Sequence, residues 1–327
     1  MNSGEGKVVC VTGASGFIAS SLIHLLLQNG YTVRATVRDP ARVDYLKAFP
    51  GAEQRLSLFQ ADLIEQGSFD EAVRGCHGVF HTASPVLFGD IKDPQAELIR
   101  PAVDGTLNVL SSCLKSPSIK RVILTSSLAA VLVNDEVIGS EGVVVDETCY
   151  SDLAFCEKIK AWYCVSKTLA EKAAWDFAKS NGIDLVVINP GLVIGRCLQP
   201  TLNYTFNYFI SLITQGNSTT GAFGFINPVD VKDAVRAHVL AFENPSAKGR
   251  YCLAATTMYH WEVVKILRGL YPTLCLPESD EEEIKGGKVI KVSKEKAKSL
   301  GIISYIPIHQ TLQDTIQMLK EKNLLVL

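Results

Sequence analysis

The hydrophobic residues in the N-terminal part of the chain follow two patterns, which take turns along the sequence. Short apolar runs predict strands over 7–11, 32–37, 56–61, 78–82, 121–125 and 185–189. Between these runs, apolar residues recur at helical spacing, most clearly over 17–28, 95–114 and 155–179. Short apolar strands that alternate with helices are typical of a parallel sheet covered on both faces. We therefore predict an α/β fold with a Rossmann-type, doubly wound parallel sheet.

After Pro190 the alternation ends, and the pattern predicts smaller elements. These are helices over 203–214, 293–300 and 311–322, short strands over 222–231 and 250–254, and a loop with a run of acidic residues over 277–283. We expect a dinucleotide-binding domain over 1–190, to which a later segment, about 226–250, returns. The remainder, mainly 191–327, is expected to form a smaller substrate-binding lobe over the carboxyl edge of the sheet.

Composition narrows the class of protein. The chain has 327 residues, is 47% hydrophobic and carries a net charge of −2, so it can bury a large core and shows no basic stripe for nucleic acid. No apolar run approaches the roughly 18 residues of a membrane span, and the N-terminus over 1–7 is polar. We expect a cytoplasmic monomer.

The spacing of the cysteines predicts free thiols and not a disulfide framework. Nine Cys are scattered along the chain without a C-x-x-C pair, which favours reduced residues and gives no metal-site spacing. Cys149 and Cys156 flank a predicted turn, so a redox-sensitive bridge between them is the less favoured alternative.

A glycine-rich turn joins the first predicted strand to the first predicted helix. Gly13 permits the tight turn, Gly16 lets the backbone approach a pyrophosphate, and the small Ala19 lets helix pack on strand. The following helix start offers free N–H groups to phosphate oxygens. A nucleotide-free glycine turn is the weaker interpretation at this place in the chain.

The end of the second predicted strand indicates which nicotinamide cofactor binds. An NAD-preferring site carries a carboxylate there for the ribose 2′-hydroxyl. This chain has Arg38, with Arg34 and Arg42 nearby, and Asp39 follows. Because a guanidinium suits a 2′-phosphate, we predict NADP(H).

Two further features predict redox chemistry on a carbonyl group. Tyr163 and Lys167 are four residues apart in a predicted helix, so the ammonium can lower the pKa of the phenol and make it a general acid near neutral pH. Ser126 and Ser127 end the strand predicted over 121–125, at the edge where doubly wound sheets place their sites. A Ser hydroxyl there can hold the carbonyl oxygen while the cofactor supplies hydride. A serine hydrolase is disfavoured, since no G-x-S-x-G elbow is present.

With these motifs the chain resembles the extended short-chain dehydrogenase/reductases, over nearly its whole length. Within them it is similar to the plant group of dihydroflavonol reductases, cinnamoyl-CoA reductases and cinnamyl-alcohol-dehydrogenase-like or phenylacetaldehyde reductases. The resemblance lies in VTGASGFIA (11–19), RATVRDP (34–40), ADL (61–63), VFHTASP (79–85), TSS (125–127), WYCVSKTLAE (162–171) and NPGLVIG (189–195).

The resemblance implies roles for individual residues. It implies that Ser127 is the catalytic serine beside Tyr163 and Lys167, and that Asn108 supports the site. The residues it implies for cofactor binding are Gly13, Ser15, Gly16, Phe17, Ile18, Arg38, Asp62, Leu63, Ala83, Ser84, Tyr163, Lys167, Pro190 and Val193. Among these, Asp62 and Leu63 would flank the adenine.

Departures from the family pattern bear on the substrate. Cinnamoyl-CoA reductases read NWYCYGK where this chain has AWYCVSK over 161–167. Leu132 stands where dihydroflavonol reductases carry an Asn that binds flavonoid hydroxyls, and Asp44 stands where family members often have Lys near the 2′-phosphate. Aromatic residues, chiefly Tyr204, Tyr208 and Phe225, are candidates for pocket walls, although about half of such aromatics are expected to be core.

We therefore predict an NADPH-dependent, reversible reductase of hydrophobic or aromatic aldehydes and ketones. The enzyme alternative is reduction of a cinnamoyl-CoA or a dihydroflavonol. A third alternative, of another class, is a non-catalytic NADP(H)-binding sensor or scaffold, which would not need Ser127, Tyr163 and Lys167 together.

Overall fold

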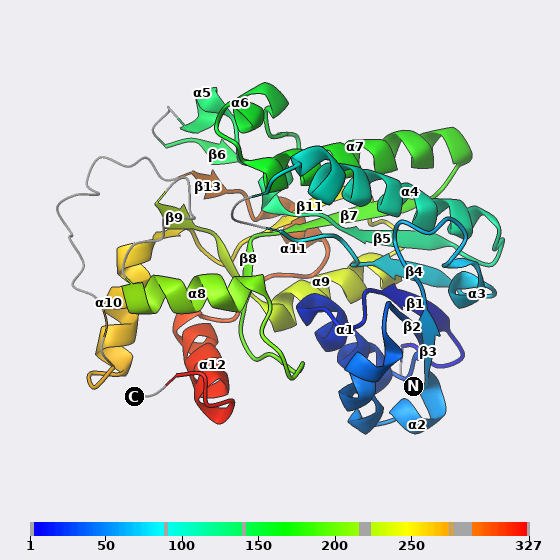
Figure 1. The fold of residues 1–327 in the computed structure, drawn as a ribbon, viewed down its shortest axis with the longest axis horizontal. Coiled ribbons are helices and arrows are strands. Elements are labelled where there is room, and N and C mark those ends of the chain that lie inside the picture. Colours follow the sequence, from blue (N-terminus) through cyan, green and yellow to red (C-terminus); the bar gives the residue numbers. More distant parts are fainter. Residues whose placement is uncertain are drawn as a thin grey trace.

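The computed structural model describes residues 3–87, 91–138, 142–215, 224–274, 276 and 290–325. Its centre is a seven-stranded parallel sheet in the order β11-β7-β5-β4-β1-β2-β3 (Figure 1). The strands are β1 (Val8–Thr12), β2 (Thr32–Val37), β3 (Leu56–Gln60), β4 (Gly78–His81), β5 (Arg121–Thr125), β7 (Leu185–Pro190) and β11 (Gly249–Leu253). The strand order reverses between β1 and β4, which is where doubly wound sheets bind their ligands.

Helices cover both faces of this sheet, as the alternating pattern predicted. On one face lie α1 (Phe17–Gln28) and α9 (Val231–Glu243), and on the other α4 (Arg100–Leu114) and α7 (Trp162–Asn181) (Figure 1). Side chains alternate across β1: Val9 and Val11 join the core under α1, whereas Cys10 joins the core under α4. The Rossmann-type fold is thus confirmed.

Shorter elements connect these layers. They are η1 (Pro40–Ala48), α2 (Ala52–Arg55), α3 (Asp70–Val73), η2 (Gln95–Ile99), η3 (Leu128–Ala130), α5 (Asp135–Ile138) and α6 (Leu153–Lys158). Beyond one end of the sheet lie α8 (Tyr204–Gln215), α10 (His260–Leu270) and α12 (Ile308–Glu321) (Figure 1). Three two-stranded pairs complete the described fold: β8 (Leu192–Ile194) with β10 (Pro228–Asp230), β9 (Phe225–Ile226) with β12 (Met258–Tyr259), and β6 (Val144–Val145) with β13 (Lys291–Val292), followed by α11 (Glu295–Ser299).

The structure corrects three details of the sequence interpretation. The helix expected over 155–179 is two helices, α6 and α7, because Lys160 adopts a positive φ of 57° between them. The strand expected over 222–231 divides, in its described part, into β9 and β10, and α9 begins at Val231. Helix α10 was not predicted from the sequence. The acidic loop expected over 277–283 lies outside the described residues.

The segment after β10 returns to the sheet. Helix α9 packs against α1, and β11 pairs with β7 from Gly249–Val186 to Leu253–Pro190. The division of the chain near residue 190 into two domains stays a prediction. Among the described helices, none has the length and apolar character needed to cross a bilayer.

Candidate active site

The glycine turn after β1 has the shape that a dinucleotide needs. Gly13 has φ 72°, and a Cβ there would lie 2.9 Å from Cα of Ala83. The N–H of Gly16 donates to the carbonyl of Gly13 at 2.8 Å, and no side chain caps the start of α1. Free N–H groups at a helix start bind phosphate oxygens, so this cradle fits a pyrophosphate.

The residues around this turn divide into exposed and buried ones. Ser15 is exposed and Ile18 half-buried beside the cradle, whereas the ring of Phe17 is buried against Phe206 with a centroid distance of 4.8 Å. Phe17 can therefore contact a cofactor chiefly through its backbone.

The structure separates the three arginines near the end of β2. Arg34 donates to the backbone carbonyl of Arg74 at 2.5 Å and is thus used elsewhere. Asp39 accepts from the N–H of Ala41 at 3.1 Å and pairs with Arg42 at 3.4 Å, so its carboxylate caps η1. Arg38 is exposed and makes no described side-chain ion pair. This arrangement leaves Arg38 for a 2′-phosphate and engages the carboxylate that would have favoured NAD. Asp44, at the position where the family often has Lys, pairs with Lys47 at 2.7 Å.

The loop expected beside the adenine is held from within. Asp62 accepts from the N–H of Ile64 at 3.1 Å, and Nδ2 of Asn108 on α4 donates to the carbonyl of Leu63 at 2.8 Å. Asn108 therefore supports this loop rather than the Ser–Tyr–Lys group.

Ser127, Tyr163 and Lys167 come together at the carboxyl end of β5. Ser127 lies two residues after β5 and caps η3 through a hydrogen bond from the N–H of Ala129 at 3.1 Å. Tyr163 lies in the first turn of α7, where the nearby Ser127 hydroxyl acts to lower the pKa of its phenol. One turn later, Nζ of Lys167 lies 5.8 Å from the centroid of the Tyr163 ring, and the Lys167 side chain is buried. The sequence prediction that these three residues meet agrees with this geometry.

Burial dominates the protonation of this group. It raises the pKa of Tyr163 above its usual value, and the nearby Ser127 hydroxyl only partly opposes the rise. Burial lowers the pKa of Lys167 to about 8, against a smaller upward effect of the Glu171 charge. The pKa of Tyr163 thus moves in the direction opposite to the sequence-based expectation, because the phenol is removed from water.

A buried histidine stands beside this group at the end of β4. The hydroxyl of Thr12 accepts from the N–H groups of Thr82 and Ala83 at 3.1 and 3.0 Å, and it lies 2.8 Å from Nδ1 of His81. With both lone pairs so engaged, the hydroxyl donates its proton to His81. Burial lowers the pKa of His81 to about 3, so the imidazole is neutral.

The remaining predicted cofactor residues lie at strand ends beside this group. Ala83 and Ser84 lie two and three residues after β4 and are half-buried. Pro190 ends β7, next to β5, and Val193 on β8 is buried. These positions surround the carboxyl edge where β4, β5 and β7 end.

The four predicted substrate residues do not form one group. Leu132 and Phe225 share an apolar cluster with Leu128, close to Ser127. Tyr208, on α8, packs against a different core, and its hydroxyl lies 2.8 Å from Nε2 of His260. Tyr204 is half-buried at the start of α8. Phe223, the other aromatic residue of the segment that holds Phe225 and a further candidate from the sequence, lies outside the described residues.

The described cysteines are free thiols, as the favoured sequence interpretation predicted. Cys149 and Cys156 are among them, so the bridge between them is not formed. The neighbour of Cys156 is instead Cys164, in the same apolar cluster.

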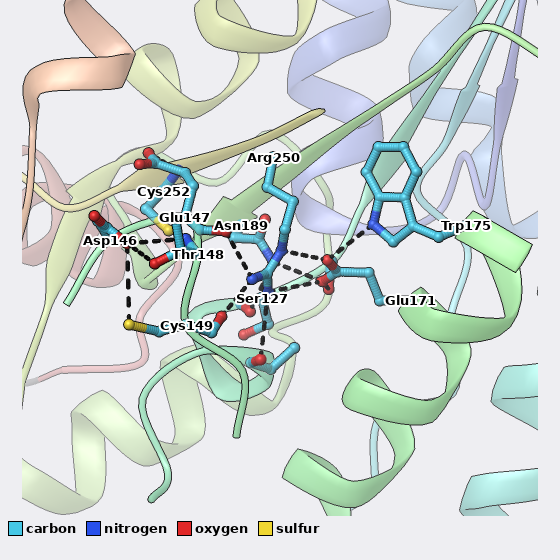
Figure 2. Close-up of polar contacts among 12 residues, drawn as sticks. Ser127, Asp146, Glu147, Thr148, Cys149, Glu171, Trp175, Asn189, Arg250 and Cys252 are labelled. Carbon is cyan, nitrogen blue, oxygen red and sulfur yellow. Dashed lines mark hydrogen bonds and ion pairs between the residues drawn. The ribbon is translucent and has the colours of Figure 1, made fainter. Parts of the chain in front are cut away.

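Sequence reasoning missed a buried polar network directly behind Ser127. Glu171 and Arg250 form an ion pair at 2.5 Å, with side chains 0% and 5% exposed, and Asn189 joins them (Figure 2). The signal was present for Glu171, which follows Lys167 by four residues in the WYCVSKTLAE motif. For Arg250 no sequence signal existed, because only β-sheet pairing brings it here.

Comparison with known proteins agrees with this geometry. Residues 9–254 match the model of the NAD dependent epimerase/dehydratase family. The chain is 55% identical to "Cinnamoyl-CoA reductase CAD2" of Medicago truncatula, over 98% of each chain, and 44% identical to "Tetraketide alpha-pyrone reductase 1" of Arabidopsis thaliana, over 86% of each.

Solved structures extend the likeness to the fold. Vestitone reductase from alfalfa (Medicago sativa) superposes with a TM-score of 0.84 at 36% identity, covering 97% of this chain and 99% of the other. The yeast methylglyoxal/isovaleraldehyde reductase Gre2, solved with NADPH, gives a TM-score of 0.85 at 28% identity, covering 97% and 100%. The chain thus belongs to the NAD dependent epimerase/dehydratase family, as an oxidoreductase of the extended short-chain dehydrogenase/reductase type.

Proposed function

We propose that this chain is an NADP(H)-dependent reductase of hydrophobic or aromatic aldehydes and ketones, acting reversibly, with Ser127, Tyr163 and Lys167 as its catalytic residues. The observation that carries the proposal is the meeting of three side chains: Ser127 acts on the phenol of Tyr163, and Nζ of buried Lys167 lies 5.8 Å from the centroid of the Tyr163 ring. This arrangement lies at the carboxyl ends of the strands, where a doubly wound sheet places its ligands.

Each of the three side chains has a distinct task. Tyr163 gives its proton to the carbonyl oxygen, and its raised pKa keeps the phenol protonated at neutral pH. The hydroxyl of Ser127, which lies beside the phenol, holds the same oxygen. The Lys167 ammonium lies under the ring and stabilises the phenolate that remains. When bound, NADPH supplies the hydride.

The cofactor residues follow from the cradle. Gly13, Ser15, Gly16, Phe17 and Ile18 would hold the pyrophosphate, and Arg38 the 2′-phosphate. Asp62 and Leu63 would flank the adenine. Ala83, Ser84, Pro190 and Val193, together with Tyr163 and Lys167, would face the ribose and nicotinamide.

The substrate class rests on the apolar surroundings of Ser127. Leu132 and Phe225 offer hydrocarbon where a polyhydroxylated ligand would need hydrogen-bond partners. Cinnamoyl-CoA reduction is the second candidate, favoured by the name of the 55% identical relative. A non-catalytic NADP(H) sensor is disfavoured because the Ser–Tyr–Lys group is intact. From the sequence we also infer a cytoplasmic monomer that uses neither nucleic acid nor a membrane as a partner.

A substrate panel with NADPH tests the proposal: phenylacetaldehyde, cinnamaldehyde, a cinnamoyl-CoA and a dihydroflavonol. We expect the aldehydes to give the highest kcat/KM. Tyr163→Phe should lower turnover by about 10²-fold or more, the usual size of general acid catalysis, while NADPH still binds in a fluorescence titration. A CoA ester as best substrate would select the second candidate. Near-normal turnover of Tyr163→Phe would refute the mechanism.

A further inference from the structure

Glu171 accepts hydrogen bonds from four directions although its side chain is fully buried. The hydroxyl of Ser126 and Nδ2 of Asn189 donate to its Oε2 at 2.6 and 2.8 Å. Arg250 pairs with its Oε1 at 2.5 Å, and Nε1 of Trp175 donates to the same oxygen at 3.3 Å (Figure 2). A buried carboxylate is costly unless it is paired and hydrogen-bonded, and here both conditions hold.

Arg250 connects this carboxylate to chain segments far away in sequence. It lies on edge strand β11 and donates to the backbone carbonyls of Glu147, Cys149 and Ala130 (Figure 2). Its guanidinium also lies 3.9 Å from the centroid of the Tyr150 ring. The Glu171–Arg250 pair therefore links β11 and α7 to the backbone at Ala130 and over 147–149.

Two of the Glu171 partners hold the backbone of Ser127. Ser126 precedes it, and Nδ2 of Asn189 donates both to Glu171 and to the carbonyl of Ser127 at 3.2 Å. Oδ1 of Asn189 is buried without a described partner, so the orientation of this amide is set by its donor side alone. The Ser127 peptide is thus held from both sides through one carboxylate oxygen.

Glu171 also shares a helix face with the candidate catalytic residues. Tyr163, Lys167, Glu171 and Trp175 follow one another at intervals of four residues along α7. The titratable groups that act on Lys167 are Glu171 and Tyr163 from α7 and His81 from β4. Near Glu171 on its other side lie Arg250, Tyr150, Lys172 and Asp176.

We propose that Glu171 is a positioning residue for the proposed reductase reaction: its carboxylate, paired with Arg250, fixes Ser127 through Ser126 and Asn189, one helical turn from the buried Lys167. The proposal rests on the proposed function and adds a residue that does not touch the substrate. In support, the charge of Glu171 raises the pKa of Lys167 against the lowering effect of burial. A purely structural ion pair would affect folding but would not change the titration of Lys167.

The test compares Glu171→Gln with Glu147→Gln. Gln keeps the shape of Glu but lacks its charge, and its amide oxygen can still accept from Ser126 and from Nδ2 of Asn189. Glu147 is a matched control in the same region, whose Oε1 accepts from the N–H of Cys252 at 2.9 Å. The measurements are the pH profile of kcat/KM for aldehyde reduction and the NADPH dissociation constant from fluorescence, each between pH 6 and 10.

We expect the basic limb of both profiles to move down by about one pH unit in Glu171→Gln, because an opposite charge nearby shifts a pKa by roughly that much or more. Glu147→Gln should leave both limbs in place. If Glu171→Gln lowers kcat equally at every pH with unmoved limbs, Glu171 is only structural and the proposal is wrong.

The double variant Glu171→Gln/Arg250→Gln guards against misfolding. Removal of both partners of a buried pair is tolerated better than removal of one. We expect it to fold and to show a smaller shift of the basic limb than Glu171→Gln, because it loses the positive charge of Arg250 together with the negative charge of Glu171. If neither variant folds while Glu147→Gln does, the pair serves folding and the positioning role is refuted. A wild-type protein that neither binds NADPH nor reduces aldehydes would instead refute the proposed function.

Discussion

At the scale of single residues, the structure assigns each charged side chain near the cofactor cradle to a different task. Arg34 binds backbone just after α3 and Asp39 caps η1, which leaves Arg38 exposed at the end of β2. The sequence favoured Arg38, at the end of the second strand, but only the fold shows that Arg34 is engaged, because the backbone that binds it is distant in sequence.

Replacing Arg38 by Glu should change cofactor preference. We expect wild-type protein to prefer NADPH clearly, and Arg38→Glu to repel the 2′-phosphate and shift the preference toward NADH. The measurement is kcat/KM for both cofactors at one saturating aldehyde concentration. Arg34→Glu is the control: it removes a guanidinium four residues earlier, within β2, and should leave the cofactor preference unchanged. Equal efficiencies with both cofactors in wild type would contradict this assignment.

At the scale of elements, the end of β7 is where the sheet and the small strand pairs meet. The N–H of Gly191 donates to the carbonyl of Leu253 on β11 at 2.9 Å, and the N–H of Leu192 donates to the carbonyl of Asn227 at 2.9 Å. A Cβ on Gly191 would lie only 1.9 Å from that Asn227 oxygen. Backbone on both sides therefore requires glycine directly after Pro190.

Gly191→Ala should consequently destabilise the protein. The clash is with backbone, which cannot rotate away, and overpacking of this kind costs about 1–3 kcal/mol. We expect a lower Tm and weaker NADPH binding, since Pro190 and Val193 flank the glycine. The control is Gly269→Ala in α10, where an added Cβ would meet no atom of the described residues within 4 Å, so this change should be neutral or slightly stabilising. An unchanged Tm for Gly191→Ala would show that β8 and β10 can separate at little cost.

At the scale of the whole molecule, buried neutral histidines connect folding to pH. Burial lowers the pKa of His81 to about 3 and those of His238 and His260 to about 4. His238 lies on α9, and its Nε2 is 2.7 Å from the Thr125 hydroxyl on β5. Each of these rings packs or hydrogen-bonds in its neutral form.

Stability should therefore fall as the solution is acidified. An unfolded His titrates near 6.5, so below that pH the unfolded state binds protons that the folded state does not. The stabilisation is fully present above pH 6.5 and is lost as pH falls toward 4, by up to about 1.4 kcal/mol per pH unit for each ring. Asp230 and Asp233, whose pKa burial raises, oppose this trend at the acid end. Urea unfolding at pH 7.5, 6.5 and 5.5 measures the effect, and a free energy independent of pH would exclude it.

The order of residues along the chain was sufficient to predict the main elements and most of the candidate site. Periodicity located six strands of the sheet within a residue or two. Strands β4, β5 and β7 are fully buried and therefore short apolar runs, whereas β2 and β3 are partly buried. The glycine turn and the Tyr163–Lys167 spacing are local in sequence, so their geometry follows from one turn and one helix. Ser126 and Ser127 could be added because parallel strands share a carboxyl edge, and the family resemblance singled out Ser127.

Features that depend on distant segments and on burial emerged only from the folded chain. Pairing with β7 brings β11 and its Arg250 to Glu171, more than half the sheet away from the glycine turn. Packing divides the predicted pocket residues, since Leu132 and Phe225 meet near Ser127 whereas Tyr208 bonds His260. Burial, which no spacing encodes, reverses the expected shift in the pKa of Tyr163. These properties arise from desolvation and long-range contacts, which exist only when the whole chain has folded.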